Sequence, residues 1–211
     1  MKKLGIIGAG GQCRAVLGII DSLKLGMPTV IYDLTQPRPD ELIMGIPVFK
    51  IPSDKELTAT RGFFKYVIAI GDNQERERIY SKLCELDCEI LTIISPFATI
   101  SSCVTLGKGV VVSPNAFVGP YAQVGDNTIL NTASIVEHEA IVGKHSHLAP
   151  ASVVCGRSKI GNLCFIGANS TIIDKISIAS NTIIGAGSVV IKSIQTEGFT
   201  WVGGPAKKIE S

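Results

Sequence analysis

Three histidines are the side chains of this sequence best suited to proton transfer near neutral pH, and all three fall between residues 138 and 147. They are His138, His145 and His147, and His138 stands between Glu137 and Glu139. A histidine beside a carboxylate is a standard general base, because the carboxylate holds one tautomer and raises the basicity of the other ring nitrogen. The alternative is ordinary solvated surface. The clustering of the three histidines favours a function.

A second candidate site follows the apolar run Lys3–Ile7, where the chain reads Gly8-Ala9-Gly10-Gly11 before a helical pattern. Glycines at such a turn let the backbone approach a phosphate at the start of a helix. Asp33, after the second predicted strand, is placed to bind a ribose or sugar hydroxyl. The alternative is a tight turn without a ligand, because the full dinucleotide fingerprint requires Gly where Cys13 stands.

The six cysteines form no recognisable metal or disulfide pattern. They are Cys13, Cys84, Cys88, Cys103, Cys155 and Cys164. No CxxC pair occurs, and Cys84 and Cys88 alone are too few ligands for zinc. We expect free thiols that are buried or half-buried, and no metal site.

The histidines lie inside a repeat of period six that fills the second half of the chain. Steps of six from Ile100 meet only Ile, Leu or Val: Leu106, Val112, Val118, Val124, Leu130, Val136, Val142, Leu148, Val154, Ile160, Ile166, Ile172, Ile178, Ile184 and Val190. Small residues such as Ala116, Ser134 and Ser152 follow four positions later. This pattern excludes a sandwich, whose strands alternate with period two.

A period of six predicts a triangular prism in which three hexads make one 18-residue coil. The aliphatic and small side chains point inward, and stacked coils pair their strands in parallel and bury a continuous apolar column. Gly and Asn near the corners, including Asn127, Asn162, Asn169 and Asn181, tolerate positive φ. His138 would then occupy a corner. His147, just before the inward Leu148, would face outward, so both should be accessible.

Residues 1–95 show no such period and predict an α/β domain. Strands are expected at Lys3–Ile7, Thr29–Tyr32, Lys65–Ile70 and Ile90–Ile94, and helices at Arg14–Leu25 and Gln74–Leu86. Strands that alternate with helices indicate a parallel sheet with helices on both faces. Ligands of such sheets bind beyond the carboxyl ends of the strands.

Composition narrows the class of protein further. The chain is 45% hydrophobic and 18% charged, with a net charge of +2 and no long run of one sign. Nothing in this balance resembles a nucleic-acid footprint. The apolar stretch at the N-terminus is too short for a secretory signal or a membrane span. We therefore expect a cytoplasmic protein with no nucleic-acid partner and no membrane insertion.

Four segments resemble the PglD/NeuD-type family of hexapeptide acyltransferases. The most specific is Asn131–His147 (NTASIVEHEAIVGKHSH), and the others are Ile6–Gln12, Ile68–Asn73 and Trp201–Lys208. The resemblance extends over nearly the whole chain. It implies a Rossmann-like domain (1–95) that binds a nucleotide sugar, then a left-handed parallel β-helix (96–211) that binds acetyl-CoA and carries out catalysis.

The resemblance also implies roles for single residues. His138 matches the catalytic base, and Glu139 matches the acid that supports it. Acetyl-CoA contacts are implied for His147, Gly156, Ala168 and Ala186, and nucleotide-sugar contacts for Gly8, Gly10, Gly11, Gln12, Asp33 and Gly71. Family members often carry His at the position of Gln12 and an acid at that of Leu34, so this chain departs from the pattern there.

The implied reaction is N-acetylation of a nucleotide-linked amino sugar, such as a UDP-4-amino sugar, in clefts between the subunits of a homotrimer. Transfer from acetyl-CoA is direct, so no cysteine is required. An alternative within acetyl transfer is O-acetylation of sialic acid, with the same fold and the same histidine but a different acceptor. The amino sugar is favoured because the first domain looks able to hold a nucleotide diphosphate.

Two alternatives from other classes remain. Some trimeric left-handed β-helices are zinc carbonic anhydrases with three histidines, but the spacing His-x₆-His-x-His sends these three in different directions, and zinc would not explain the first domain. The other is an inert scaffold or binding module, which would release no coenzyme A with any nucleotide amino sugar.

Overall fold

The computed structural model describes residues 3–24, 26–59 and 64–209, and the chain forms two compact units that divide between Ile93 and Ile94. Within the described residues, no helix combines the length and the apolar character needed to cross a bilayer.

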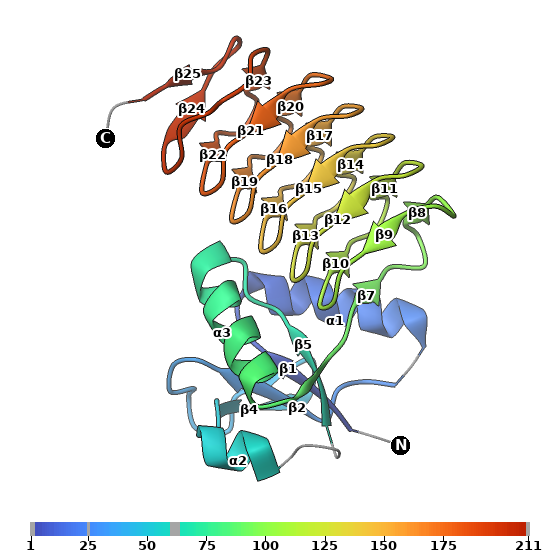
Figure 1. Cartoon of the computed structure of the whole chain (residues 1–211). Helices are drawn as coiled ribbons and strands as arrows, with labels where there is room; N and C mark the ends of the chain where they lie inside the picture. The colour runs from blue at the N-terminus through green and yellow to red at the C-terminus, as the bar shows by residue number, and fades with distance from the viewer. Residues whose placement is uncertain (1–2, 25, 60–63, 210–211) are drawn as a thin grey trace. The chain divides into compact units, whose positions relative to one another are not determined.

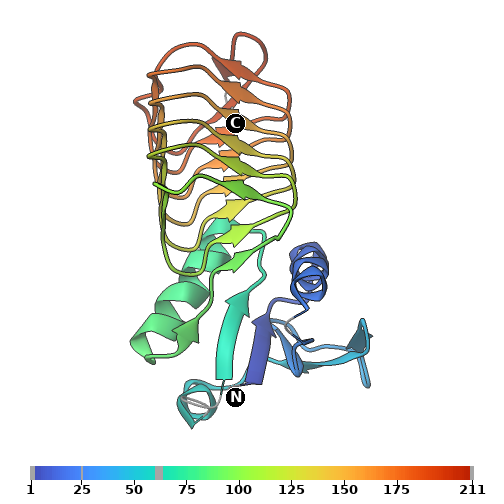
Figure 2. The same ribbon diagram turned by 90° about the vertical axis from the view of Figure 1, so that its right-hand side faces the viewer.

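The first unit is a six-stranded sheet with the order β3-β4-β2-β1-β5-β6, in which every neighbouring pair is parallel except the hairpin β3–β4. Helix α1 covers one face of the sheet, and α2 and α3 cover the other (Figures 1 and 2). Its elements are β1 (Lys3–Ile7), α1 (Gly11–Leu23), β2 (Val30–Asp33), β3 (Leu42–Ile43), β4 (Ile46–Lys50), α2 (Asp54–Ala59), β5 (Phe64–Ile68), α3 (Asn73–Glu85) and β6 (Glu89–Ile90). The predicted parallel sheet with helices on both faces is confirmed.

Several predicted boundaries in this unit are wrong. Helix α1 begins at Gly11 and not at Arg14, because Gly10 already adopts the extended conformation of an N-cap. The predicted helix end at Leu25 lies outside the described residues. The single strand predicted for Ile90–Ile94 is two strands: β6 pairs with β5, whereas β7 (Ile93–Ile94) joins a sheet of the second unit. The prediction lacked β3, β4 and α2.

The second unit is a parallel β-helix built from two-residue strands, as the repeat predicts, and it is left-handed, as the family resemblance implies (Figure 1). From β8 to β20, each strand pairs with the strand eighteen residues later, for example Phe117 with Ile135. The strands are β8 (Thr99–Ile100), β9 (Thr105–Leu106), β10 (Val111–Val112), β11 (Phe117–Val118), β12 (Gln123–Val124), β13 (Ile129–Leu130), β14 (Ile135–Val136), β15 (Ile141–Val142), β16 (His147–Leu148), β17 (Val153–Val154), β18 (Lys159–Ile160), β19 (Phe165–Ile166), β20 (Thr171–Ile172), β21 (Ser177–Ile178), β22 (Ile183–Ile184) and β23 (Val189–Val190). They form the three sides of the prism.

The period-six ladder is the core of this unit. Its members from Val112 to Val190 are all at most 3% exposed and form one apolar cluster. Ser134, Ser152 and Ser170 of the small-residue column are also buried. Full burial of one aliphatic side chain stabilises a fold by about 1.5–3 kcal/mol, so the repeated column holds the coils together without a conventional core.

Each corner of the prism carries one residue in the left-handed conformation. These residues recur every six positions with φ between 55° and 62°: Asn115, Tyr121, Asn127, Ala133, Glu139, His145, Ala151, Arg157, Leu163, Asn169, Lys175 and Asn181. The conformation costs an ordinary residue about 1–2 kcal/mol. A hydrogen bond to the preceding coil offsets this cost, as when the His145 N–H donates to the Asp126 carbonyl at 2.9 Å.

Asn162 is not among these residues, so its predicted positive φ is wrong. Its side-chain oxygen instead accepts a hydrogen bond from the Lys144 N–H at 2.9 Å. At some positions between a strand and a corner, the next coil limits the size of the side chain. A Cβ atom at Gly143 would stand 2.5 Å from the backbone of Gly161 in the next coil, so close stacking requires glycine there.

The last coil is covered by the segment that contains β24 (Thr200–Val202) and β25 (Lys207–Lys208). Strand β24 pairs with β22 in parallel, and β25 then reverses direction against β24. Trp201 and Ala206 pack against the end of the apolar column.

Candidate active site

His138 lies at a corner of the prism, in the turn between β14 and β15, as predicted. Its side chain is 51% exposed, and Nδ1 is 3.2 Å from the Glu139 Oε2 atom. A carboxylate can only accept a hydrogen bond, so Nδ1 carries the proton of the neutral ring and Nε2 keeps its lone pair. The arrangement can take a proton from a group that approaches Nε2.

Gly156, one coil further, leaves the space in which the His138 ring lies. A Cβ atom at Gly156 would stand 2.6 Å from both Cε1 and Nε2 of that ring. At Gly119, in the preceding coil, an added Cβ atom would stand 2.7 Å from the His138 backbone nitrogen. Among the described residues, the Gly156 N–H has no hydrogen-bond partner, so a backbone donor lies beside the imidazole.

Arg157 is a member of this corner that the sequence analysis missed. Its Nε donates to the Glu139 Oε2 atom at 2.8 Å, the same oxygen that faces His138. The hydrogen bond from Arg157, followed by that from His138, lowers the pKa of the Glu139 carboxyl. The signal was present as a spacing of eighteen residues between Glu139 and Arg157, which is one complete coil.

His145 and His147 have different surroundings from His138. His145 is 8% exposed, and its Nδ1 accepts a hydrogen bond from the Asn127 amide at 2.9 Å. His147 is also 8% exposed, so its predicted accessibility is wrong. Its Nε2 lies 3.2 Å from the Asn131 amide nitrogen, and its ring meets the Phe165 ring edge to face at 5.1 Å.

The four residues with implied acetyl-CoA contacts do not lie together within one chain. Gly156 shares the corner of His138, whereas His147 lies on the sheet that contains β13, β16 and β19. Ala168 and Ala186 lie on a different corner, in the turns that follow β19 and β22. The side of the prism that contains β14, β17 and β20 separates that corner from the corner of His138.

In the first unit, the implied nucleotide-sugar residues follow three neighbouring strands at their carboxyl ends. Gly8 follows β1, Asp33 ends β2, and Gly71 follows β5. Gly8 is required by the fold, since its φ is 111° and a Cβ atom would meet the Ala69 carbonyl oxygen at 2.5 Å.

Gly10, Gly11 and Gly71 have no such structural requirement. None has a positive φ, and open space surrounds each position where a Cβ atom would stand. The lack of side chains there leaves room for a ligand to approach the backbone.

The start of α1 is suited to an anion. Its N-cap, Gly10, provides no side-chain hydrogen bond, and its first turn contains no acidic residue. The start of α3, by contrast, is capped by a side chain, because the Asp72 Oδ1 accepts a hydrogen bond from the Glu75 N–H at 2.8 Å. An uncapped helix start attracts phosphate through its free N–H groups and its dipole. Arg14 also donates to the carbonyls of Ala9 and Gly10 at 2.9 and 3.0 Å, which fixes the loop.

Gln12, in the first turn of α1, has a buried side-chain nitrogen without a hydrogen-bond partner among the described residues. A buried donor without a partner is costly unless a ligand accepts its hydrogen bond. Asp33, whose side-chain oxygen is 3.4 Å from the Thr35 N–H, is partly exposed at the end of β2.

Arg76 is a second residue that the sequence analysis missed. It is 1% exposed, and its guanidinium donates to the carbonyls of Ile70, Gly71 and Asp72 at 2.9–3.2 Å. Burial lowers the pKa of Arg76 to about 10, whereas Asp72 acts in the opposite direction. The loop after β5 is thus held around a buried cation. A charged residue inside an amphipathic helix pattern was the only available signal.

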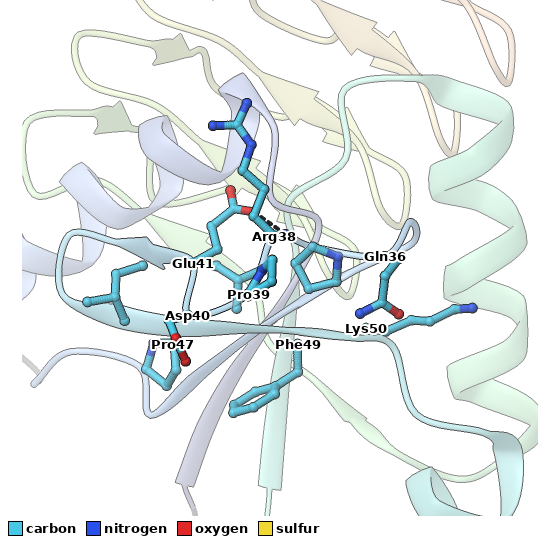
Figure 3. A pocket seen from close by; sticks show the side chains of 11 residues that line it. Gln36, Arg38, Pro39, Asp40, Glu41, Pro47, Phe49 and Lys50 are labelled. Carbon is cyan, nitrogen blue, oxygen red and sulfur yellow. Dashed lines mark hydrogen bonds between the residues drawn. The ribbon is translucent and has the colours of Figure 1, made fainter.

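The first unit also contains a hollow of about 530 Å³ beside the hairpin β3–β4 (Figure 3). Its walls are the loop Gln36–Leu42 and the strand residues Pro47–Lys50. The Phe49 ring is 54% exposed, and Lys50 pairs in register with Asp33. This hollow could not be predicted from the sequence, because β3 and β4 were not predicted.

The cysteines are free, but Cys84 and Cys103 are exposed, so their predicted burial is wrong. Burial raises the pKa of Cys13 and of Cys164 to about 11, which makes both thiols poor nucleophiles. Within the described ranges, no three His, Cys, Asp or Glu side chains come together in a group that could hold a metal.

The sequence and fold together define a hexapeptide-repeat transferase with an added α/β domain. The family profile of the PglD N-terminal domain matches residues 3–83. That of the bacterial transferase hexapeptide (six repeats) matches residues 157–192. A search of curated proteins finds no match to the chain.

Solved structures resemble the chain over its full length. PerB from Caulobacter crescentus, in complex with CoA and GDP-perosamine, is 30% identical, with a TM-score of 0.90 over 100% of this chain and 98% of that one. A His-to-Asn mutant of perosamine N-acetyltransferase from the same organism is 29% identical, with a TM-score of 0.91 over 100% of this chain and 98% of that one. The acetyltransferase domain of PglB from Neisseria gonorrhoeae FA1090, in complex with acetyl coenzyme A, is 30% identical, with a TM-score of 0.88 over 99% of each chain. The chain belongs to the PglD-type family of hexapeptide-repeat acetyltransferases.

Proposed function

We propose that this protein transfers the acetyl group of acetyl-CoA to the amine of a nucleotide-linked amino sugar, with His138 as general base. The observation that carries the proposal is the imidazole–carboxylate pair at an open corner, in which Nδ1 of His138 lies 3.2 Å from Oε2 of Glu139. Because the carboxylate favours the tautomer with the proton on Nδ1, Nε2 of the neutral ring can accept a proton. Its support is the likeness to acetyltransferases whose structures contain CoA and GDP-perosamine.

In the proposed reaction, the sugar amine attacks the thioester carbonyl carbon while Nε2 of His138 takes a proton from the amine. A carbon–nitrogen bond forms, and the carbonyl oxygen becomes an oxyanion. The N–H of Gly156, which lies beside the ring, is a suitable donor to that oxyanion. The intermediate collapses as the carbon–sulfur bond breaks, and the imidazolium returns the proton to the thiolate, so coenzyme A leaves as a thiol.

The acetyl-CoA contacts are proposed for Gly156, His147, Ala168 and Ala186. These residues lie on different sides of one prism, which supports a cleft between copies in which one chain provides His138 and a neighbour provides other contacts. A homotrimer is the proposed assembly.

The outward side chains of the prism support such an interface. The side with β11, β14 and β17 carries the partly buried Phe117, Ile135 and Val153. The side with β12, β15, β18 and β21 carries the polar Gln123, Lys159 and Ser177 and only one apolar outward residue, Ile141, among these four strands. Sedimentation should give three times the chain mass of 22.3 kDa.

Residues 1–95 are proposed to hold the nucleotide sugar and residues 96–211 to hold acetyl-CoA. Gly8, Gly10, Gly11 and Gly71 would line the diphosphate, and Gln12 and Asp33 would bind polar groups of the substrate. The uncapped start of α1 and the unsatisfied nitrogen of Gln12 support this assignment. The six free thiols fit the reducing conditions of the cytoplasm, which is the proposed location.

The test is a panel of nucleotide-linked amino sugars with acetyl-CoA, read by thiol release, beside sialic acid as the acceptor of the alternative reaction. We expect coenzyme A release with at least one UDP-, GDP- or dTDP-linked amino sugar, and acetylation at its amine by mass spectrometry. Release with sialic acid alone would show that the acceptor is wrong. No release with any acceptor would overturn the proposal.

A further inference from the structure

Three side chains at the His138 corner meet at one oxygen atom. Oε2 of Glu139 is 2.8 Å from the Arg157 Nε and 3.2 Å from the His138 Nδ1. Glu139 and Arg157 occupy equivalent left-handed corner positions in successive coils, with φ of 57° and 62°. The Arg157 N–H donates to the His138 carbonyl at 3.0 Å, so the backbone itself places the guanidinium above the carboxylate.

Such a pair on a surface adds little to stability, because water screens it. Its effect on the imidazole is more specific. A carboxylate alone favours the protonated ring by charge attraction, and a cation on the same oxygen offsets part of that attraction. The pair therefore keeps the hydrogen bond that orients the ring while it weakens the charge that would hold the proton on it.

Within the described part of the chain, the hydrogen-bond and ion-pair partners of the shared oxygen are His138 and Arg157, and the corner has other titratable and charged groups besides these. Glu137 precedes the ring, Tyr121 occupies the corner below, and Cys155 precedes Gly156 above. Two coils above His138, Asp174 is paired with Lys175 at 3.3 Å. Among the described residues, Arg157 is the cation in contact with the carboxylate that orients His138.

We propose that Arg157 is a positioning residue that orients the Glu139 carboxylate toward His138 and offsets its charge, so that the ring works as a free base at lower pH. The kinetic part of this inference rests on the proposed function. Nothing in the hexapeptide repeat requires an arginine here, since Lys175 occupies the same corner position one coil further.

The kinetic test compares Arg157→Met with Arg157→Lys. In Arg157→Met the charge of Glu139 is no longer offset, the imidazolium is stabilised, and the acidic limb of the kcat/KM profile should move to higher pH by about half a unit. The limb moves upward because a more strongly held proton needs a higher pH to leave. We expect kcat to fall about 3–10-fold with little change in either KM, since the carboxylate loses its fixed orientation.

Arg157→Lys keeps the charge and should keep the wild-type acidic limb, although it loses part of kcat because an ammonium cannot reproduce the guanidinium geometry. Lys175→Met is the matched control. It removes a cation from the same corner position, but from a pair with Asp174 rather than Glu139, and should leave the acidic limb unchanged.

An NMR titration of the ligand-free protein tests the inference without activity. The chain has three histidines, so the Cε1–H signal of His138 can be assigned by its loss in His138→Ala. Its titration midpoint should rise in Arg157→Met and not in Lys175→Met. Equal midpoints in wild type and Arg157→Met would overturn the inference even if acetyl transfer is found. A raised midpoint with no acetyl transfer would leave the charge effect intact and overturn the proposed function instead.

Discussion

The corners that carry His138 and His145 are built from the same hexapeptide turn, yet they are opposite chemical environments. His138 is about half exposed and faces a carboxylate, with a glycine one coil above. His145 is 8% exposed and faces the Asn127 amide, with Leu163 one coil above. The backbone fold is therefore shared, and the chemistry of each corner depends on which side chains the adjoining coils provide.

The comparison shows where a β-helix encodes its sites. Residues eighteen positions apart become neighbours, as in Glu139–Arg157 and Asn127–His145. A site in this fold is therefore encoded by two or three short motifs separated by one coil, and a single local motif encodes only part of it.

The largest expected effect on rate is at the His138 corner. His138→Ala should lower kcat by about 10²–10⁴-fold if His138 is the general base that we propose, since this is the usual contribution of such a group. The melting temperature should change little, since the side chain is exposed and does not belong to the apolar column. Steady-state kinetics and thermal denaturation provide the two measurements. A variant with near-wild-type turnover would remove His138 from the mechanism.

A smaller effect is expected from Gly156→Ala, which fills the space occupied by the His138 ring. The ring must move, and displacement of a catalytic group by about 1 Å can cost roughly 10²-fold in rate. Gly143→Ala is the matched control, because its Cβ atom would meet backbone rather than the ring. That control should lower the melting temperature, whereas Gly156→Ala should mainly lower kcat. The reverse pattern would show that the ring does not need this space.

The smallest effect on rate is expected at the other corner. His145→Ala removes the hydrogen bond between its Nδ1 and the Asn127 amide and should cost about 0.5–1.5 kcal/mol of unfolding free energy, the usual net contribution of one intramolecular hydrogen bond. Urea denaturation measures this loss, and kcat at a temperature where the variant is folded should remain close to wild type. A large loss of kcat in the folded variant would make the two corners functionally equivalent.

Much of the fold could be predicted because it depends on a local rule. The aliphatic residue at every sixth position determines the coil, the strands and the corner position of His138. The grouping of the glycine-rich turn with Asp33 was also predictable, because parallel strands align their carboxyl ends at one edge of the sheet.

The rest could not be predicted because it depends on contacts distant in sequence. An outward position on the prism predicted that His147 is accessible, but its burial depends on Asn131 and Phe165, which belong to other coils. The role of Arg76 depends on carbonyls that only the folded loop brings together. The hairpin β3–β4 is too short and too exposed for hydrophobic periodicity to reveal it.

The reversal of direction between β24 and β25 also has a consequence for solubility. A stack of identical rungs leaves its final rung open to growth by another chain, as in fibrous assemblies. Here the last strand of each side is already paired. Strand β24 pairs with β22, and Ile194 forms a bridge with Ile178 of β21. In β23, the Val189 N–H donates to the Gly203 carbonyl, and the Val189 carbonyl accepts from the Ala206 N–H. The same periodicity that makes the prism easy to build would otherwise make it polymerise end to end.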